Sequence, residues 1–249
     1  MKLKRLSWAG VEVTSGRWRI IVDALEDTVP FRAFAGPPRA PLVPVPIDGR
    51  TWALVTHVHR DHCDRGLLAR VATGQVVCHA PIVTTMAESG LAAVGVGLWE
   101  TRSIGPFQVT PVPSQDWRSD DQVAWVIEGD GQRIIHCGDT IWHGQWYAID
   151  RRLGPFDVAF LPINGFIAQL EGFTPTDVPG SLTPEQAIEA AVVLRAQTAC
   201  AIHHSLFDNP PNYAQQPDAV RRFLAAGARR GVTAIVPGDG ETVPFVARA

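Results

Sequence analysis

The segment from residue 56 to residue 62 reads THVHRDH and holds three of the chain's eight histidines together with one aspartate. Neutral imidazole is the commonest metal ligand in proteins, and imidazole combined with carboxylate suits zinc, iron or manganese. A loop of solvated or capping histidines is the less specific interpretation. It is disfavoured because crowding so many groups that can become cationic is unfavourable without a metal. The pattern therefore predicts a metal site.

The residues before this segment predict the strand that positions it. The run WALVTH is short and apolar, as in a buried strand, and it ends at His57. His57 and His59 are two residues apart, so both side chains can project to the same side of the chain. Asp61 and His62 come from the turn that follows. One short loop can thus supply four ligands.

Two further segments share this arrangement of a strand followed by an abrupt polar end. RIIHCGDT places Asp139 just after a β-rich run, with Gly138 allowing a close backbone approach, and ACAIHHS places His203 and His204 at the end of another run. The motif GDT alone would indicate only a turn whose aspartate caps its own backbone. Beside the histidine segment, it predicts a ligand that converges with the others along one edge of a sheet.

In this order and at roughly this spacing, THVHRDH, GDT and IHHS resemble the motifs of the metallo-β-lactamase-fold hydrolases. The segments GPFDVAFLPING, AIHHSLF and a helix that starts Pro-Glu-Gln-Ala are similar to the branch that contains N-acylphosphatidylethanolamine phospholipase D and the ascorbate-phosphate lactonases. The resemblance covers nearly the whole chain. It implies an α/β fold built as a four-layer αββα sandwich, with a site for one or two metal ions at one edge.

The resemblance also implies how two divalent ions, zinc or manganese with iron as a further option, would be held. The implied ligands are His57 and His59 for the first ion, Asp61, His62 and His203 for the second, and Asp139 between the two. His204 stands where the phospholipase-like pattern has an aromatic residue, which makes it a candidate for a hydrogen bond to substrate or for a structural role. The choice between His203 and His204 as ligand stays open.

One position departs from the branch pattern. Where the branch has a histidine ligand in a segment like PAQHW, this chain reads PSQDW, with Asp116 in the histidine's place. If Asp116 binds the first ion, the added carboxylate makes that site harder and shifts its preference from zinc toward manganese or iron. If Asp116 does not reach, one ion binds or the first site is weakened.

The ligands suggest a hydrolytic mechanism without a covalent intermediate. Two cations that share a water molecule lower its pKa from 15.7 toward ~7. Asp61 and Asp139 are the candidate catalytic residues, and Asp61 is expected to orient the nucleophile or relay its proton. A small ester, lactone or phosphoester would be the substrate. The alternatives are a metal-binding protein whose altered first site is not catalytic, and a nuclease of the same superfamily.

Other residues are predicted to shape the pocket. Trp142 and His143 follow the GDT motif and are candidate substrate contacts, although core packing is the default for such residues. Residues 26–50 contain six prolines and no regular periodicity, so they predict a long surface loop. This loop and the stretch FIAQLEGFTPTDVPGS are expected to border the pocket mouth or to form an oligomer contact.

The composition of the chain bears on its domain number, its partners, its location and its disulfide content. The 249 residues, 46% of them hydrophobic, predict a single domain over residues 1–249, and the net charge of -3 gives no support to nucleic-acid binding. No signal-peptide core or run of ~20 apolar residues occurs, which predicts a cytoplasmic protein without a membrane span. Four dispersed cysteines without a CxxC pair argue against a disulfide framework. A small molecule is the expected partner, and a homo-oligomer is an open option.

The coarse pattern of elements agrees with an α/β fold. Strands are predicted within the first 25 residues, at 75–78, 104–112, 123–128 and 133–137, in FDVAFLP and ACAIHH, and as a pair after the last helix. The turn EGDGQ predicts a hairpin. Helices are predicted at 65–71, 81–89 and 217–229, and a fourth starts at Pro184, with Thr183 as its cap and Gln186 closing a capping box.

Overall fold

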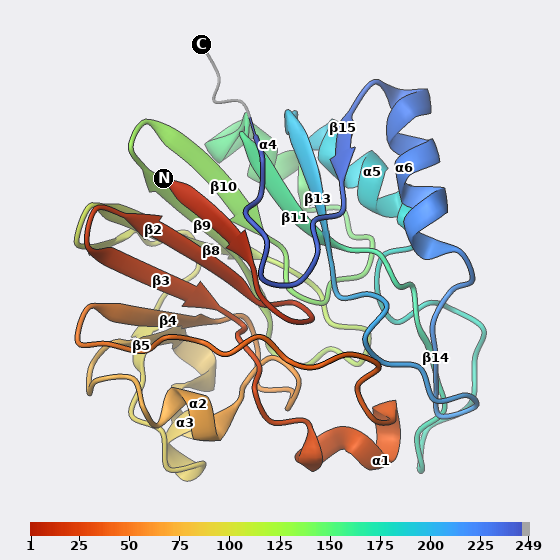
Figure 1. Cartoon of the computed structure of the whole chain (residues 1–249), viewed down its shortest axis with the longest axis horizontal. Helices are drawn as coiled ribbons and strands as arrows, with labels where there is room; N and C mark the ends of the chain where they lie inside the picture. The colour runs from red at the N-terminus through yellow and green to blue at the C-terminus, as the bar shows by residue number, and fades with distance from the viewer. Residues whose placement is uncertain (246–249) are drawn as a thin grey trace.

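The computed structural model describes residues 1–245 and contains two large β-sheets (Figure 1). The first sheet comes from the N-terminal part of the chain and has six strands in sequence order. They are β1 (Lys2–Arg5), β2 (Val11–Ser15), β3 (Trp18–Val22), β4 (Thr51–Val55), β5 (Val76–His79) and β6 (Val94–Val96). β1, β2 and β3 pair antiparallel, whereas β3, β4, β5 and β6 run parallel to their neighbours.

The second sheet has seven strands in the order β15-β13-β11-β10-β9-β8-β7. Their bounds are β7 (Arg102–Ile104), β8 (Phe107–Pro113), β9 (Val123–Gly129), β10 (Gln132–His136), β11 (Val158–Pro162), β13 (Thr198–Ile202) and β15 (Thr233–Ile235). β7, β8, β9 and β10 form an antiparallel meander, and β10, β11, β13 and β15 are parallel.

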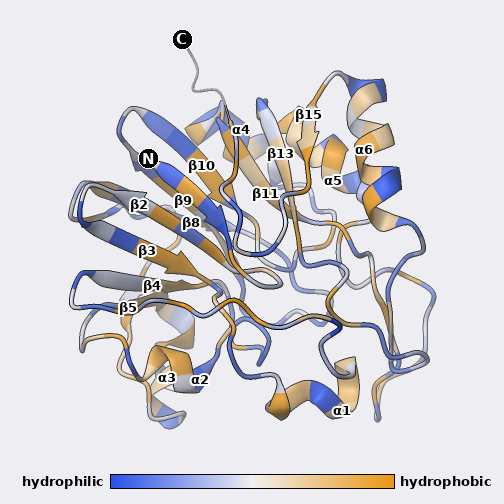
Figure 2. Ribbon diagram, viewed as in Figure 1, coloured by the Kyte–Doolittle hydropathy of each residue, from blue (hydrophilic) through white to orange (hydrophobic). Residues whose placement is uncertain are grey.

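Helices cover the outer face of each sheet. The helices α2 (Arg65–Leu68) and α3 (Val83–Glu88) pack on the first sheet, and α4 (Trp146–Leu153), α5 (Pro184–Val193) and α6 (Ala219–Arg230) pack on the second. In Figure 2, hydrophobic and hydrophilic residues alternate along α6, as expected for a helix that buries one face. The largest buried cluster lies between the two sheets and includes Val13, Ile20, Ile127 and Val158. The predicted αββα sandwich is therefore confirmed.

Strand direction explains why polar residues gather at one edge. Two successive antiparallel pairings make β8 parallel to β10, and β10, β11 and β13 are parallel to one another. The carboxyl ends of these four strands therefore meet at the same edge of the second sheet. By the same reasoning β1, β3 and β4 end at a common edge of the first sheet. Loops that leave these ends can bring residues distant in sequence into one site.

Several local predictions are confirmed. The hairpin of β9 and β10 turns at Asp130 and Gly131, both with positive φ. Thr183 accepts a hydrogen bond from the backbone N–H of Gln186, whose side chain accepts one from the backbone N–H of Thr183, which completes the predicted capping box of α5. Gly138 has φ 65°, and a Cβ on it would lie 3.0 Å from Oγ1 of Thr56. All four cysteines are free and buried.

Other local predictions were wrong. The strand predicted at 104–112 is interrupted at Gly105, where a positive φ turns the chain between β7 and β8. Within the described residues, the predicted terminal strand pair reduces to β15 and a single bridge between Lys4 and Thr242. The strand β6 and the helix α4 had not been predicted.

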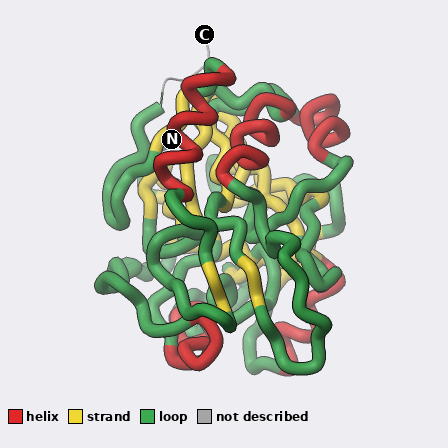
Figure 3. The backbone as a smooth tube through the Cα atoms, turned by 90° about the vertical axis from the view of Figure 1, so that its right-hand side faces the viewer, coloured by secondary structure: helices red, strands yellow, loops and turns green. Residues whose placement is uncertain are grey.

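Two irregular segments flank the edge where the strands end. Residues 26–50 include a short 3-10 helix, Val29–Phe31, and α1 (Arg32–Ala35). The segment after β11 contains β12 (Ile167–Ala168), which pairs with β14 (Tyr213–Ala214) apart from the two main sheets (Figure 3). Over the described residues, no helix combines the length and apolar character needed to cross a bilayer.

Candidate metal centre

His57 lies two residues after the end of β4, and its side chain is completely buried. Its Nδ1 lies 2.9 Å from Oγ1 of Thr56, and that hydroxyl donates to Oδ2 of Asp23 over 2.6 Å. Because the hydroxyl proton is used on Asp23, Thr56 accepts the Nδ1 proton of His57. The lone pair of His57 is then on Nε2, which is buried and has no hydrogen-bond partner among the described residues.

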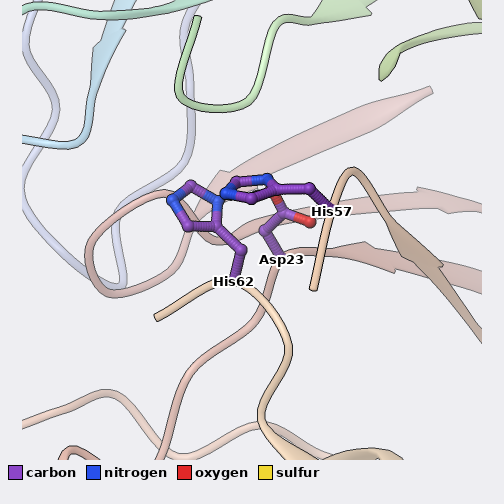
Figure 4. A group of neighbouring side chains, drawn as sticks. All are labelled: Asp23, His57 and His62. Carbon is purple, nitrogen blue, oxygen red and sulfur yellow. Dashed lines mark hydrogen bonds and ion pairs between the residues drawn. The ribbon is translucent and has the colours of Figure 1, made fainter. Parts of the chain in front are cut away.

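His62 is held in the same way from the following turn. Its Nδ1 donates to Oδ2 of Asp23 over 2.8 Å, and its Nε2 is buried without a hydrogen-bond partner in the described structure. The rings of His57 and His62 are 4.3 Å apart between centroids and are tilted by 42°. Figure 4 shows the two imidazoles side by side with Asp23 next to them. A hydrogen bond on one ring nitrogen fixes which nitrogen is available to a metal.

His203 follows β13 and completes this group of imidazoles. Its Nδ1 lies 3.2 Å from Oδ1 of Asn164, while its Nε2 lies 3.4 Å from Oδ2 of Asp61 and 3.6 Å from Oδ2 of Asp139. The Nε2 of His62 also lies 3.4 Å from Oδ2 of Asp61. Two imidazole nitrogens and two carboxylates therefore face one small volume.

A second set of donors lies around His59. Its Nδ1 is 3.8 Å from Oδ2 of Asp116, a buried oxygen without a hydrogen-bond partner among residues 1–245. The other oxygen of Asp116, Oδ1, accepts a hydrogen bond from the backbone N–H of Arg118 over 2.7 Å, so Oδ2 is the oxygen that remains for a ligand role. The Nε2 of His59 is 2.8 Å from Oδ2 of Asp120 and also contacts the Arg118 guanidinium. Asp116 thus lies close enough to share an ion with His59.

Asp139 lies between the two sets of donors. Its Oδ1 is buried and makes no hydrogen bond within the described part of the chain, while its Oδ2 is the oxygen that faces His203. Burial raises the pKa of Asp139 well above its ordinary value, and the charges of Asp61 and Asp116 raise it further against the opposing effect of His62. A carboxylate among other carboxylates in a buried site requires a cation if it is to stay ionised.

The donors fit a divalent cation site. Five buried atoms converge on this edge without hydrogen-bond partners among the described residues: Nε2 of His57, His62 and His203, Oδ2 of Asp116 and Oδ1 of Asp139. Leaving such atoms unpaired costs about 1–3 kcal/mol each. Imidazole nitrogen and carboxylate oxygen together suit zinc, manganese or iron. Burial, followed by the charges of His62 and His59, lowers the pKa of His57 well below its ordinary value, which keeps this imidazole neutral for binding.

Geometric groupings alone would also include Asp23 and Asp120 as ligands, but their hydrogen bonds favour another role. Both oxygens of Asp23 are engaged, Oδ1 by the backbone N–H of Thr56 and Oδ2 by Thr56 and His62. Asp120 contacts the Nε2 of His59, on the opposite side of the ring from the nitrogen that faces Asp116. These two carboxylates orient histidine ligands.

His204 lies apart from these donors. Its Nε2 is 3.3 Å from Nη1 of Arg5 and its Nδ1 is 2.8 Å from Oγ of Ser205. Burial, then the charge of Arg5, lowers its pKa to about 3. His203 has φ 55°, and this left-handed backbone separates the directions of the two adjacent side chains. The geometry favours His203 over His204 as the ligand and gives His204 a packing contact with Arg5.

Trp142 and His143 lie beside the site rather than in it. His143 stacks on Trp146, with ring centroids 4.2 Å apart, and Trp142 lines a neighbouring cavity of about 240 Å³. Trp117 lines that cavity and also the one that opens onto the candidate ligands. A substrate contact by Trp142 or His143 would therefore require a molecule that extends past Trp117.

The supporting residues were missed in the sequence. Asp23, Trp8 and Asn164 have no recognisable motif, and each is brought to the ligands by a separate strand end. Asp23 carried the clearest signal, because a carboxylate interrupts the apolar run IIVDAL where β3 ends. Arg118 and Asp120 lie next to Asp116 but gave no signal of their own.

A cavity of about 280 Å³ opens onto the candidate ligands His59, Asp61 and Asp139. Phe31 and Phe34 reach it from the Pro-rich segment, and Phe166 and Leu170 reach it from the segment around β12. The prediction that both segments border the pocket is thereby confirmed. A larger hollow of about 670 Å³ lies near the start of α6, but none of the candidate ligands lines it.

Comparison with known proteins agrees with this architecture. Residues 18–204 match the family described as "Beta-lactamase superfamily domain". A "UPF0173 metal-dependent hydrolase" from Pyrococcus abyssi is 26% identical over 248 residues, which covers 96% of this chain and 98% of the relative. One from Thermus thermophilus is 27% identical over 251 residues, covering 96% and 97%.

Solved structures show the same fold at low sequence identity. Igni18, a metallo hydrolase from Ignicoccus hospitalis, superposes with a TM-score of 0.70 at 18% identity, covering 97% of both chains. CmlA, a diiron β-hydroxylase from Streptomyces venezuelae, gives a TM-score of 0.68 at 17% identity, covering 97% of this chain and 53% of its own. Because the family match extends over most of its length, the chain belongs to the beta-lactamase superfamily.

Proposed function

We propose that the protein is a metal-dependent hydrolase that holds two divalent ions and cleaves an ester, lactone or phosphoester of a small molecule. The observation that carries this proposal is a group of five buried donor atoms without hydrogen-bond partners among the described residues, one of which belongs to Asp139 in the lining of a cavity. The relatives named as metal-dependent hydrolases support the same class of activity. The narrower resemblance to the phospholipase and lactonase branch stays a prediction.

The ligands divide into two sets of similar composition. His57, His59 and Asp116 would hold the first ion, Asp61, His62 and His203 would hold the second, and Asp139 would offer one oxygen to each. Each set then contains two imidazoles and two carboxylates. The carboxylate of Asp116 makes the first set harder than one with a third imidazole, which favours manganese or iron relative to zinc.

When bound, divalent ions at these atoms would lower the pKa of a water molecule and withdraw electron density from the oxygen of the scissile bond. Asp61 lines the cavity, and its Oδ2 is fixed by the indole N–H of Trp8. Burial opposes ionisation of Asp61, but the charge of His62 and the nearby imidazoles of His203 and His62 hold its pKa well below the ordinary value. Asp61 is therefore ionised and placed to orient the attacking water and accept its proton.

Hydrolysis adds water across the scissile bond. The water oxygen joins the carbonyl carbon or the phosphorus, and the oxygen that leaves takes a proton, for which Asp61 is the nearest carrier in the cavity. No side chain is required to form a covalent bond with the substrate. The small cavity favours a small substrate over a polymer, because its volume lies at the lower end of the range for ligand pockets.

The test combines metal content with turnover. The protein loaded with manganese or zinc is assayed against an aryl ester, a lactone and a phosphodiester, and the His59→Ala variant is compared with His79→Ala, a half-buried histidine at the end of β5. We expect turnover of at least one substrate class, its loss in His59→Ala and its retention in His79→Ala. Full turnover in folded His59→Ala would overturn the mechanism, and bound metal without turnover would favour a binding protein.

A further inference from the structure

The cavity above the candidate ligands has an aromatic wall built from four separate segments of the chain. Besides Val58, its apolar lining consists of Phe31, Phe34, Trp117, Phe166, Leu170 and Tyr213. The 3-10 helix and α1 contribute the first two, the loop between β8 and β9 contributes Trp117, and the β12–β14 pair and its flanks contribute the rest. Phe166 and Tyr213 are buried members of the core between the sheets, and Phe31, Phe34 and Trp117 pack against it, so the core holds the wall in place at the cavity.

The rings of this wall pack on one another and are fixed in orientation. Phe166 stacks on Tyr213 with centroids 4.7 Å apart, and Phe34 meets Tyr213 edge-on at 5.4 Å. Trp117 meets Phe166 at 6.0 Å and an interplanar angle of 86°. The hydroxyl of Tyr213 accepts a hydrogen bond from Asn164 over 2.7 Å, which helps to fix the ring. Preorganised rings bind a flat apolar group without first losing side-chain freedom.

Two arginines supply the only positive side chains in the described cavity lining. Arg118 is paired with Asp120 over 2.7 Å and lies over Trp117, with 5.6 Å between its guanidinium carbon and the ring centroid. Arg60 is exposed and makes no ion pair within residues 1–245. The cavity lining therefore combines one unneutralised positive charge, the aromatic wall and the carboxylates of Asp61 and Asp139.

From this juxtaposition we infer that the substrate is a small anionic molecule that carries one aromatic or similarly flat apolar group. The flat group lies against Phe166, Tyr213 and Trp117, the anionic group lies toward Arg60, and the scissile bond faces Asp61 and Asp139. The inference rests on the proposed function for the identity of the reacting bond. A volume of about 280 Å³ leaves room for one such group.

Binding of unreactive probes tests the substrate class separately from catalysis. Phenylacetate, acetate and 2-phenylethanol are titrated into the metal-loaded protein by calorimetry, so that ring and charge are removed one at a time. We expect phenylacetate to bind about tenfold more tightly than acetate, which reports the ring, and more tightly than 2-phenylethanol, which reports the charge.

Variants assign these differences to the named residues. Trp117→Ala should weaken both phenylacetate and 2-phenylethanol by about tenfold, whereas Trp99→Ala, a half-buried tryptophan outside the cavity, should change neither. Arg60→Gln should weaken phenylacetate alone, and Arg65→Gln, an exposed arginine on α2, should have no effect.

A failure of the inferred substrate class and a failure of the proposed hydrolytic function would give different results. Equal affinity for phenylacetate and acetate, or no effect of Trp117→Ala, would overturn the substrate class even if an ester or lactone is hydrolysed. Ring- and charge-dependent binding in a protein that hydrolyses none of the three substrate classes would instead count against the proposed hydrolytic function.

Discussion

The indole N–H of Trp8 donates to Oδ2 of Asp61 over 3.0 Å, while the Trp8 ring lies 4.0 Å from the ring of His203. The carbonyl oxygen of Trp8 also accepts the backbone N–H of His203 over 3.1 Å. Trp8 is buried and has φ 60°, a left-handed conformation that is unusual for a bulky residue. One residue from the N-terminal sheet thus positions two candidate ligands that come from opposite halves of the sandwich.

Trp8→Phe keeps a ring against His203 but removes the donor to Asp61. We expect the ion held by Asp61, His62 and His203 to bind about 10–100-fold more weakly, because groups that orient ligands typically contribute this much to metal affinity. Calorimetric titration of the metal-free protein measures the change. Trp125→Phe is the matched control, since the indole of Trp125 is also buried but donates to the carbonyl of Val55. An equal loss in both variants would indicate general destabilisation.

Asp116 decides the composition of the first ligand set. Asp116→Ala should lower the metal content from two ions per chain toward one, because it removes a buried oxygen without replacing it. Asp116→His should restore two ions and shift the relative affinity from manganese toward zinc. Elemental analysis after dialysis against equal concentrations of both metals measures number and identity together. Unchanged metal content in Asp116→Ala would remove this residue from the ligand set.

Asp23 is not a candidate ligand, but it accepts hydrogen bonds from His62 and Thr56. It therefore tests whether a carboxylate that orients the ligands affects metal binding. Asp23→Asn is isosteric, but its amide offers hydrogens toward His62 and Thr56, both of which already donate there. Metal affinity should fall about 10–100-fold. Asp157→Asn is a suitable control, since Asp157 is equally buried and accepts the backbone N–H of Arg133 near the opposite ends of the strands. It should lower the unfolding midpoint and leave metal affinity unchanged.

His143 predicts a pH dependence of stability. Burial lowers its pKa to about 4, whereas in the unfolded chain the imidazole takes up its proton near 6.5, the ordinary pKa of histidine. The unfolded state binds more protons between these values, so stability should fall as pH drops from about 6.5 to about 4, by up to ~3 kcal/mol from this residue.

Urea unfolding of wild type and His143→Phe at pH 7 and pH 4.5 isolates this contribution. The phenylalanine ring keeps the stack on Trp146 but cannot be protonated. The wild type should therefore lose more stability than the variant on acidification. An identical loss in both would show that His143 is not the group responsible.

The grouping of the candidate ligands at one edge was largely predictable because their sequence signals are local. The histidine segment and GDT follow apolar runs that form β4 and β10, and parallel strands bring such ends to one edge. The helix α5 was equally predictable, since its cap, first proline and capping box lie within a few residues. Neither inference required knowledge of distant contacts.

The supporting residues could not be predicted in the same way. Trp8 and Asp61 are separated by 53 positions and Asp23 and His62 by 39, so their hydrogen bonds exist only once β1, β3 and β4 have come together in the first sheet. The direction of the His204 side chain depends on the left-handed backbone of His203. No neighbouring glycine or proline in the sequence predicts that conformation. The break at Gly105 was missed because the apolar pattern continues on both sides of the turn.

Metal removal should destabilise the folded protein as well as inactivate it. Without cations, the charges of Asp61 and Asp116 act unscreened on Asp139, and burial already raises the pKa of Asp139. We expect the thermal midpoint to fall on chelation and to recover on addition of manganese or zinc, since a ligand that binds only the native state stabilises it. A midpoint that is insensitive to chelation of a metal-containing sample would contradict this coupling.

The number of ions bound per chain is the decisive measurement for the proposal that two ligand sets each hold a divalent ion. Metal-free protein is titrated with manganese and with zinc, and wild type is compared with His57→Ala and His203→Ala, one from each ligand set. We expect two ions per chain for the wild type and one for each variant. A folded wild-type protein that binds no ion, or that binds two ions unaffected by either substitution, would contradict it.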